Sequence, residues 1–336
     1  MKQTDDLLLA KNLAILNNRI RALCKANSPS LQKVVDWIFS APGKQIRPIL
    51  TFLCYGLDGR TRGGDPVEAA AITEICHTAS LVHDDVIDGA DMRRGVLSVQ
   101  KKFGKEMAVY TGDFMIFSVM RHTRLANRLW YRDMLDYLQV MCDGEVSQYD
   151  HQYDLEITEE QNLVNIVGKT SSMFQLACTS GAYEGGIRGR RLEAVDAFAR
   201  HLGILFQFRD DYMDFVATSE ASRKSAHEDF RSGYYTLPAI HAFRDPVAGP
   251  QLREIALGLK ESGGVATPEQ TARINELVAA VGGFDYTIGR IREEADAALA
   301  ALDVFDESPS KERLRSFVRR LCTSVLETPA PSVPRA

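Results

Sequence analysis

Apolar residues recur at spacings of three and four along almost the whole chain, and alternating strand-like runs joined by Asn-Gly or Asp-Gly turns are missing. This pattern is typical of amphipathic helices. Three helix starts also carry capping signals, namely Thr158 with Gln161, Thr267 with Gln270, and Ser308 before Pro309. The pattern therefore predicts an all-α fold.

No shift in composition marks a linker, and no strong internal repeat is visible in the sequence. Gly- and Pro-rich stretches at 59–66, 184–190 and 245–250 are predicted loops between helices. We expect one large helical domain over residues 1–327 and a flexible tail over 328–336.

Composition narrows the possible functions. The 336 residues are 45% hydrophobic and 25% charged, which is ordinary for a globular protein. Forty basic against 45 acidic side chains give a net charge of −5, which argues against nucleic-acid binding. Six scattered cysteines without a CxxC pair, and no apolar stretch long enough to span a membrane, favour a soluble protein of the cytoplasm.

Two acidic clusters share the spacing DDxxD. The first contains Asp84, Asp85 and Asp88, followed by Asp91, and the second contains Asp210, Asp211 and Asp214. On a continuous helix, residues 84, 88 and 91 would lie on one face with His77. Sets of carboxylates with few histidines suit Mg²⁺, which typically bridges carboxylates to substrate phosphates. The alternative is that each cluster is a solvated helix face.

Basic residues near these clusters are candidates for diphosphate contacts, since Arg binds phosphate by bidentate hydrogen bonds and Lys as a point charge. They are Lys44, Arg47, Arg93, Arg94, Lys169 and Lys224. The segment PGKQIRP lacks the glycine spacing of a nucleotide-binding phosphate loop.

The ordered segments GKQIRP, EICHTASLVHDDVIDGADMRRG, YTGDF, GKTSSMF, FQFRDDYMDF and YYTLPAI resemble those of the trans-type isoprenyl diphosphate synthases, or polyprenyl synthetases. The resemblance runs from about residue 40 to about residue 325. It implies a single bundle of antiparallel helices around a central cavity, the isoprenoid synthase fold, usually in a homodimer. It also implies isopentenyl diphosphate and an allylic diphosphate as substrates.

The resemblance implies roles residue by residue. Asp84, Asp88, Asp210 and Asp214 match ligands of three Mg²⁺ ions, with Asp85 and Asp211 supporting them in catalysis. Lys44, Arg47, His77 and Arg94 match the isopentenyl diphosphate site. The allylic diphosphate contacts match Arg93, Lys169, Thr170, Gln207 and Lys224, of which Arg93 and Lys169 are also expected to act in catalysis. The family often has Lys where this chain has Tyr234, so one expected diphosphate contact is absent.

Ionisation of the allylic diphosphate would give a carbocation, which the double bond of isopentenyl diphosphate attacks before a proton is lost. The growing chain needs an apolar shaft, and one helical turn of 5.4 Å gates about one isoprene unit. Above the first cluster all gating candidates are small, namely Thr73, Cys76, Ala79 and Ser80. We therefore predict all-trans products of roughly thirty to forty carbons. The alternative is that these small residues only let two helices pack closely.

Two other functions stay open. His83 beside Asp84, with His77 nearby, allows an HD-type metal-dependent phosphohydrolase, although that class does not require a second DDxxD cluster. A partner-dependent subunit of a heteromeric polyprenyl synthase is the other, favoured by the missing Lys at Tyr234 and opposed by the full set of aspartates. A head-to-head condensing enzyme or terpene cyclase ranks lower, because neither is expected to retain GKQIRP.

Overall fold

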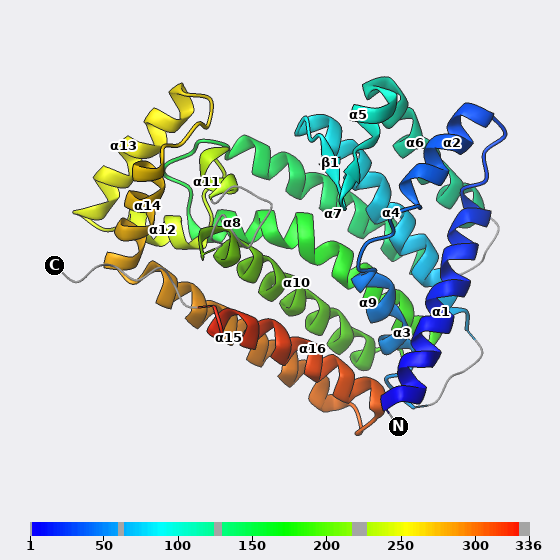
Figure 1. The fold of residues 1–336 in the computed structure, drawn as a ribbon. Coiled ribbons are helices and arrows are strands. Elements are labelled where there is room, and N and C mark those ends of the chain that lie inside the picture. The colour runs from blue at the N-terminus through cyan, green and yellow to red at the C-terminus, as the bar shows by residue number, and fades with distance from the viewer. Residues whose placement is uncertain (1, 60–63, 124–129, 217–226, 329–336) are drawn as a thin grey trace. The chain divides into compact units, whose positions relative to one another are not determined.

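The structure is a computed structural model and describes residues 2–59, 64–123, 130–216 and 227–328 (Figure 1). Its elements in chain order are α1 (Lys2–Leu23), α2 (Pro29–Ile38), α3 (Ile46–Tyr55), α4 (Pro66–Ile87), β1 (Met92–Arg93), β2 (Val96–Leu97), α5 (Val99–Phe103), α6 (Lys105–Thr123), α7 (Trp130–Asp150), α8 (Glu159–Ile166), the π-helix η1 (Val167–Ser171), α9 (Ser172–Glu184), α10 (Arg190–Val216), α11 (Glu228–Arg231), α12 (Leu237–Phe243), α13 (Ala248–Glu261), α14 (Pro268–Ala280), α15 (Gly283–Ala301), the 3₁₀-helix η2 (Leu302–Val304) and α16 (Pro309–Leu326).

The all-α prediction is confirmed. In the described ranges the only strands are β1 and β2, which form a two-residue antiparallel pair with Met92 opposite Leu97. The predicted caps are also present: Thr158 and Thr267 both form complete capping boxes, and the Ser308 hydroxyl accepts a hydrogen bond from the Lys311 amide. The polar residues before these helices satisfy amides that the first helical turn leaves unpaired.

Contacts within the chain group it into two compact units. Unit 1 contains residues 1–136, 176–196 and 305–311, and unit 2 contains residues 137–175, 197–304 and 312–336. Neither the single-domain prediction for residues 1–327 nor the central cavity is tested by this grouping, and both stay predictions. Residues 329–336 of the predicted tail lie outside the described ranges.

Helix α4 is the centre of unit 1 and packs against α1, α3 and α6 (Figure 1). Every residue from Ala69 to Cys76 is buried, so this part of the helix is covered on all sides. The Asp65 side chain caps its first turn, and Pro66 occupies the first helical position. The helix therefore begins at a strong local signal and is held by packing along its whole first half.

The end of α4 differs from the sequence prediction. Gly89 adopts a left-handed φ of 65°, and the Ala90 amide donates to the Asp85 carbonyl, which is the Schellman arrangement of a helix terminus. Asp88 is consequently the C-cap, and Asp91 lies outside the helix, where its carboxylate pairs with Lys101 at 2.9 Å. The expectation that Asp91 shares a helix face with Asp84 and Asp88 was wrong, because the Asp-Gly pair ends the helix first.

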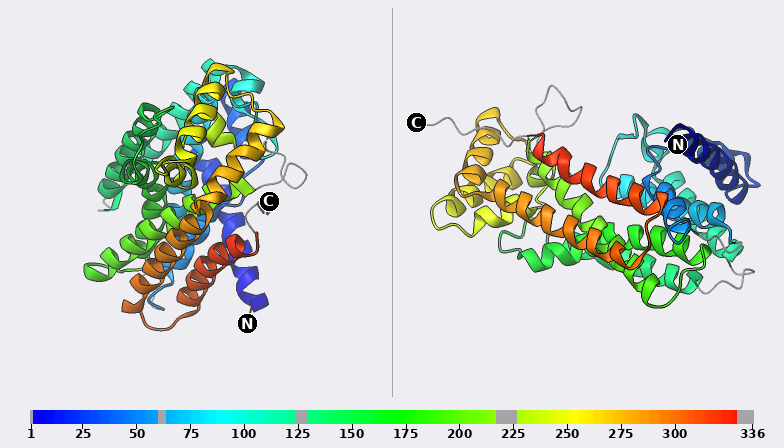
Figure 2. Two further views of the ribbon diagram at one scale, coloured as in Figure 1. Left: turned by 90° about the vertical axis from the view of Figure 1, so that its left-hand side faces the viewer. Right: turned by 90° about the horizontal axis from the view of Figure 1, so that it is seen from below.

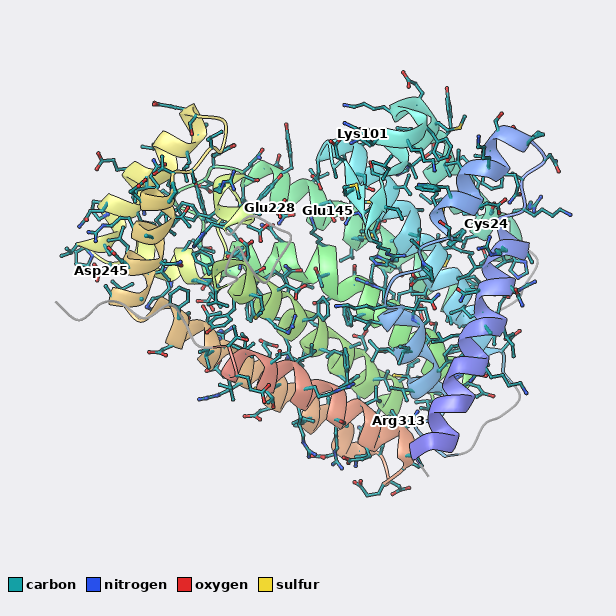
Figure 3. All side chains as sticks on the ribbon, viewed as in Figure 1. Cys24, Lys101, Glu145, Glu228, Asp245 and Arg313 are labelled. Carbon is teal, nitrogen blue, oxygen red and sulfur yellow. The ribbon has the colours of Figure 1, made fainter. Side chains whose placement is uncertain are left out.

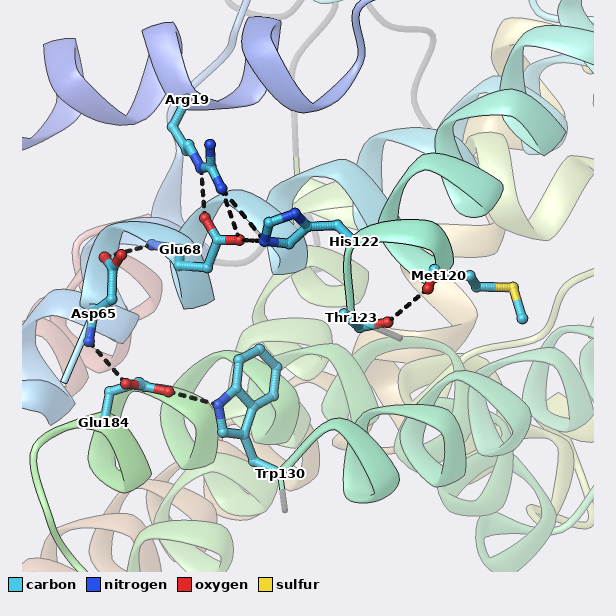
Figure 4. A network of polar contacts seen from close by, with 8 residues as sticks. All are labelled: Arg19, Asp65, Glu68, Met120, His122, Thr123, Trp130 and Glu184. Carbon is cyan, nitrogen blue, oxygen red and sulfur yellow. Dashed lines mark hydrogen bonds and ion pairs between the residues drawn. The ribbon is translucent and has the colours of Figure 1, made fainter. Parts of the chain in front are cut away.

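A buried carboxylate near the other end of α4 links three helices of unit 1 (Figure 4). Glu68 is 4% exposed and accepts a hydrogen bond of 2.5 Å from Arg19 Nε of α1. Its other oxygen forms an ion pair with His122 of α6. A buried carboxylate needs such partners because desolvation of its charge is costly.

Unit 2 has an aromatic core and a layer of long helices. Phe215 makes edge contacts with Phe230 and Phe284, and Phe230 packs on Tyr235 and Phe243. Helices α15 and α16 run side by side in all views (Figures 1 and 2), and Arg209 of α10 donates a hydrogen bond to Ser324 of α16. The second acidic cluster lies on α10, so it is built on a well-packed helix.

Among the described helices, none combines the length and the apolar character needed to cross a lipid bilayer.

Candidate active site

The first acidic cluster occupies the C-terminal end of α4. Asp84 is half-buried, Asp88 is exposed, and Asp85 is 2% exposed. Asp85 Oδ1 accepts hydrogen bonds from Arg93 Nε at 2.7 Å and from Arg93 Nη2 at 2.5 Å. Burial raises the pKa of Asp85, and the Arg93 guanidinium partly offsets this. Asp85 thus faces Arg93 of β1, and its supporting role in catalysis stays a prediction.

His83, the residue that allowed a hydrolase, packs against α6. Its Nε2 atom lies 3.1 Å from the Val109 carbonyl oxygen and 3.6 Å from Asp113 Oδ1. A Cβ atom on Gly112 would lie only 2.2 Å from that nitrogen, so the imidazole fills the space over the glycine. His83 therefore joins α4 to α6, and this contact gives no support to the HD-type hydrolase.

The predicted isopentenyl diphosphate residues converge in unit 1. Arg47 Nη1 of α3 lies 2.9 Å from His77 Nε2 of α4. Arg94 Nη1 donates to the Pro42 carbonyl at 2.8 Å, and a Cβ atom on Gly43 would meet Arg94 Nε at 2.7 Å. The exposed Lys44 follows Gly43 in the same loop, two residues before α3 begins. All four residues named from the resemblance therefore lie around one loop.

Burial affects the charge states of Arg47 and His77. It lowers the pKa of Arg47 to about 10, which leaves the guanidinium charged at neutral pH. It also lowers the pKa of His77 well below its usual range, with the charge of Arg47 adding to the effect. His77 is consequently neutral, accepts a hydrogen bond from Arg47 and adds no third positive charge.

The second acidic cluster occupies the last two turns of α10. Asp210 pairs with Arg209 at 2.8 Å, and the Asp214 carboxylate accepts hydrogen bonds from the amides of Glu228 and Asp229 at 3.2 and 3.3 Å. Asp211 is 2% exposed, and burial raises its pKa well above the ordinary value. The cluster therefore repeats the first one, with a buried central aspartate between more accessible neighbours.

A chain of hydrogen bonds runs from the second cluster to the π-helix η1. The Thr170 hydroxyl donates to Gln207 Oε1 at 2.8 Å, and Gln207 Nε2 donates to Asp211 Oδ1 at 2.8 Å. Lys169 Nζ contacts Glu145 Oε2 at 2.9 Å and Gln148 Oε1 at 2.8 Å, both on α7 (Glu145 is labelled in Figure 3). Three predicted allylic-site residues are thus connected within unit 2.

Magnesium fits the residues of both clusters. Aspartates at the C-terminal ends of helices add to the negative end of the helix dipole, so each cluster attracts cations. Asp211 Oδ2 is buried and has no hydrogen-bond partner among the described residues. In the described ranges no three His, Cys, Asp or Glu side chains converge to hold a metal ion by themselves. Mg²⁺ does not need such a set, because it is usually bound by one or two carboxylates, water and substrate phosphate.

Two further positions near the predicted allylic diphosphate site are Lys224 and Tyr234. Lys224 lies outside the described residues, in the segment 217–226. Tyr234 is half-buried, and its amide donates to the Asp229 carbonyl at 2.9 Å. The missing Lys is therefore replaced by an aromatic residue in the turn that follows α11.

The small residues proposed as a chain-length gate are mostly buried in α4. Thr73 and Ala79 are fully buried, Cys76 is 3% exposed and lies near Cys24, the residue that follows α1, and Ser80 is half-buried. Close packing of α4 against α1 and α6 is therefore one consequence of their size. Their role in product length stays a prediction.

Three polar residues contact the predicted site residues but were not among the sequence predictions. Glu74 lies 3.6 Å from Arg94, and Glu145 and Gln148 hold Lys169. Glu74 had one signal, because it is the single charged residue in the buried stretch AAAITEIC. Glu145 and Gln148 lie in a helix rich in polar residues, where nothing distinguishes them.

An all-helical chain with two DDxxD clusters, each at the end of a long helix, has features of the prenyl diphosphate synthases. The family model described as polyprenyl synthetase matches residues 28–273. The chain therefore belongs to the polyprenyl synthetase family and is a prenyltransferase that elongates allylic diphosphates.

Individual relatives agree with this assignment. The octaprenyl diphosphate synthase of Escherichia coli is 32% identical over 310 residues, which cover 91% of this chain and 94% of that protein. The all-trans-nonaprenyl-diphosphate synthase of Rhodobacter capsulatus is 32% identical over 93% and 94% of the two chains. The crystal structure of a decaprenyl diphosphate synthase from Rhodobacter capsulatus has a TM-score of 0.86 at 27% identity, over 95% and 98% of the chains. The predicted isoprenoid synthase fold is confirmed.

Proposed function

We propose that the chain condenses an allylic diphosphate with isopentenyl diphosphate to an all-trans polyprenyl diphosphate of about forty carbons. This is the length at which the sequence prediction overlaps the name of the octaprenyl relative. The names of other relatives give nine and ten isoprene units. We therefore propose the upper end of the range predicted from the sequence, which was roughly thirty to forty carbons.

The metal ligands in this proposal are Asp84, Asp88, Asp210 and Asp214, for three Mg²⁺ ions. The observation that carries it is the shared construction of the clusters, each at a helix C-terminal end around a buried aspartate. A polyprenyl synthase from Caulobacter crescentus, 28% identical with a TM-score of 0.83, was crystallised with calcium and isoprenyl diphosphate. The calcium and isoprenyl diphosphate in that relative support the proposal that this chain binds a divalent cation together with a diphosphate substrate.

Bound Mg²⁺ supplies positive charge that stabilises the departing pyrophosphate. The chain's own residues then bind and orient the substrates. Lys44, Arg47 and Arg94 bind the diphosphate of isopentenyl diphosphate, with neutral His77 holding Arg47 in place. Lys169, Arg93 and the Thr170–Gln207 pair bind the allylic diphosphate, together with Lys224. Orientation of the double bond towards the allylic carbon makes the condensation effectively intramolecular.

We further propose that the enzyme is a homodimer of the cytoplasm. The alternative is a subunit that needs an unlike partner, which the replacement of Lys by Tyr234 favours. Retention of both aspartate clusters favours the homodimer, because a non-catalytic subunit does not need metal ligands.

One assay tests catalysis, primer and length together. Purified protein is incubated with Mg²⁺, labelled isopentenyl diphosphate and one allylic primer at a time, from five to twenty carbons, and the dephosphorylated products are sized. We expect labelled all-trans alcohols of about forty carbons. Absence of any elongated product with every primer would favour the partner-dependent subunit, and products of twenty carbons or fewer would contradict the proposed length.

A further inference from the structure

Glu74 is an unusual residue for its surroundings. It is 3% exposed in the middle of α4, in the stretch from Ala69 to Cys76 that is buried throughout. Its neighbours in that stretch are apolar except for Thr73, whose hydroxyl bonds within the helix to the Ala69 carbonyl. A carboxylate at such a position is costly to desolvate, so it needs compensating charge.

The compensating charge comes from the predicted isopentenyl diphosphate site. Glu74 Oε1 lies 3.6 Å from Arg94 Nη2, and Arg47 also acts on Glu74 by charge. Glu74 in turn favours the charged form of Arg47, whose burial opposes it. One carboxylate therefore neutralises part of the charge of two guanidinium groups.

The geometry shows that Arg94 is fixed on two sides. Its guanidinium donates to the Pro42 carbonyl, and its side chain passes so close to Gly43 that a Cβ atom there would lie 2.7 Å from Nε. Glu74 lies at another terminal nitrogen of the same guanidinium. Arg94 is thus held between the loop that precedes Lys44 and the buried carboxylate on α4.

We propose that Glu74 is a positioning residue for isopentenyl diphosphate: its buried carboxylate holds Arg94 and Arg47 together so that their guanidinium groups face the diphosphate. Glu74 does not contact the substrate. This inference rests on the proposed isopentenyl diphosphate site. Without the carboxylate, the two guanidinium groups repel each other, and Arg94 keeps only its hydrogen bond to the Pro42 carbonyl to fix its orientation.

Glu74→Gln tests the inference, with KM measured separately for the two substrates at pH 8. We expect KM for isopentenyl diphosphate to rise about tenfold or more, with little change in kcat or in KM for the allylic primer. Glu74→Asp keeps the negative charge but has a side chain that is one methylene shorter. We therefore expect a smaller rise in KM for isopentenyl diphosphate. If Glu74→Gln does not fold, Glu74→Asp provides the measurement.

Glu68→Gln is the matched control. Glu68 is equally buried six residues earlier on the same helix and pairs with Arg19 and His122 instead (Figure 4). We expect Glu68→Gln to lower the stability of the protein without changing KM for isopentenyl diphosphate. Equal KM changes in the Glu68 and Glu74 variants would mean that Glu74 only stabilises α4, and would overturn the inference.

Arg94→Lys separates failure of the inference from failure of the proposed site. If Arg94→Lys raises KM for isopentenyl diphosphate and both Glu74 variants leave it unchanged, the site stands and the inference fails. If neither Arg94→Lys nor the Glu74 variants alter this KM, the assignment of Arg94 to isopentenyl diphosphate is wrong.

Discussion

At the scale of single residues, the aspartates within each DDxxD cluster differ in burial. The central residues Asp85 and Asp211 are each 2% exposed and accept hydrogen bonds from Arg93 and Gln207. The outer aspartate Asp88 is exposed. A buried carboxylate is oriented by fixed donors, whereas an accessible one can bind a hydrated ion, so the same spacing serves both purposes.

Asp84→Asn removes one proposed Mg²⁺ ligand. We expect kcat to fall by about a thousandfold, because a charge that stabilises the leaving pyrophosphate is no longer held. The free energy of unfolding should change by less than about 1 kcal/mol, since a carboxylate at a helix C-terminal end contributes little to stability. Steady-state kinetics and urea unfolding measure both quantities.

Asp91→Asn is the control for this substitution. Asp91 belongs to the same acidic segment, but it lies beyond the end of α4 and pairs with Lys101 at the surface (Figure 3 labels Lys101). Its replacement should leave kcat within about twofold, because exposed ion pairs contribute little. Comparable losses in both variants would show that general acidity, rather than metal binding, explains the cluster.

Glu74 should also make stability depend on pH. Burial raises its pKa from 4.5 to about 7, so between these values the folded chain binds more protons than the unfolded chain. Its contribution is complete below pH 4.5 and is lost as pH rises to 7, a decrease of up to about 3 kcal/mol. Urea unfolding at pH 5 and pH 8 should show this decrease in the wild type relative to Glu74→Gln. An identical difference between the two proteins at both pH values would contradict it.

At the scale of elements, helix starts were easier to predict than the end of α4 and the π-helix η1. The capping boxes at Thr158 and Thr267 depend on residues three positions apart, so the sequence contains the whole interaction. The Schellman end of α4 depends on Gly89 and was missed because the acidic spacing suggested a longer helix. The π-helix η1 has no signal in apolar periodicity, because its i→i+5 hydrogen bonds are set by neighbours in space.

Close helix approaches hold η1 in place. A Cβ atom on Gly168 would lie 2.5 Å from Gly144 Cα of α7, and one on Gly203 of α10 would lie 2.5 Å from Ser171 Cα. These glycines bring two helices against the segment that carries Lys169 and Thr170. Backbone contact of this kind leaves no room for a methyl group.

Gly168→Ala should therefore move η1 and its polar side chains. We expect a loss of about 1–3 kcal/mol in stability from overpacking, together with a higher KM for the allylic substrate. Gly289→Ala in α15 is the matched control, because its added Cβ meets nothing within 4 Å. There the substitution should stabilise the helix by up to about 1 kcal/mol. Unaltered kinetics and stability for Gly168→Ala would argue against a fixed η1.

At the scale of the whole molecule, the property to be explained is the chain length of the product. It depends on how far an apolar shaft extends from the metal site, and helix turns near Ala79 and Ser80 are the proposed gate. Ala79 is fully buried, so a larger side chain there must displace its neighbours or the growing chain.

Ala79→Tyr should shorten the products by one or more isoprene units, and Ser80→Phe, at a less buried position, should do the same at a smaller cost in stability. Thin-layer chromatography of the dephosphorylated alcohols measures the change. Products of wild-type length from both variants would reject the gate and leave the small residues with a packing role only.

The features determined by sequence alone are local or compositional. The helices follow from apolar periodicity, their starts from capping residues, and the chemistry from DDxxD clusters whose members lie within one turn. Family membership follows from six segments in order along the chain. Each of these signals is carried by residues that are neighbours in sequence, so no tertiary contact is needed to recognise it.

Tertiary structure decided which polar groups are paired and which are charged. Burial and partners 20 or more positions away place Glu74 against Arg94, Lys169 against Gln148, and His83 against the Val109 carbonyl. The pKa of a side chain depends on its desolvation and on charges brought near by folding. The residues that orient the predicted site were therefore decided by packing, because their partners are distant in sequence.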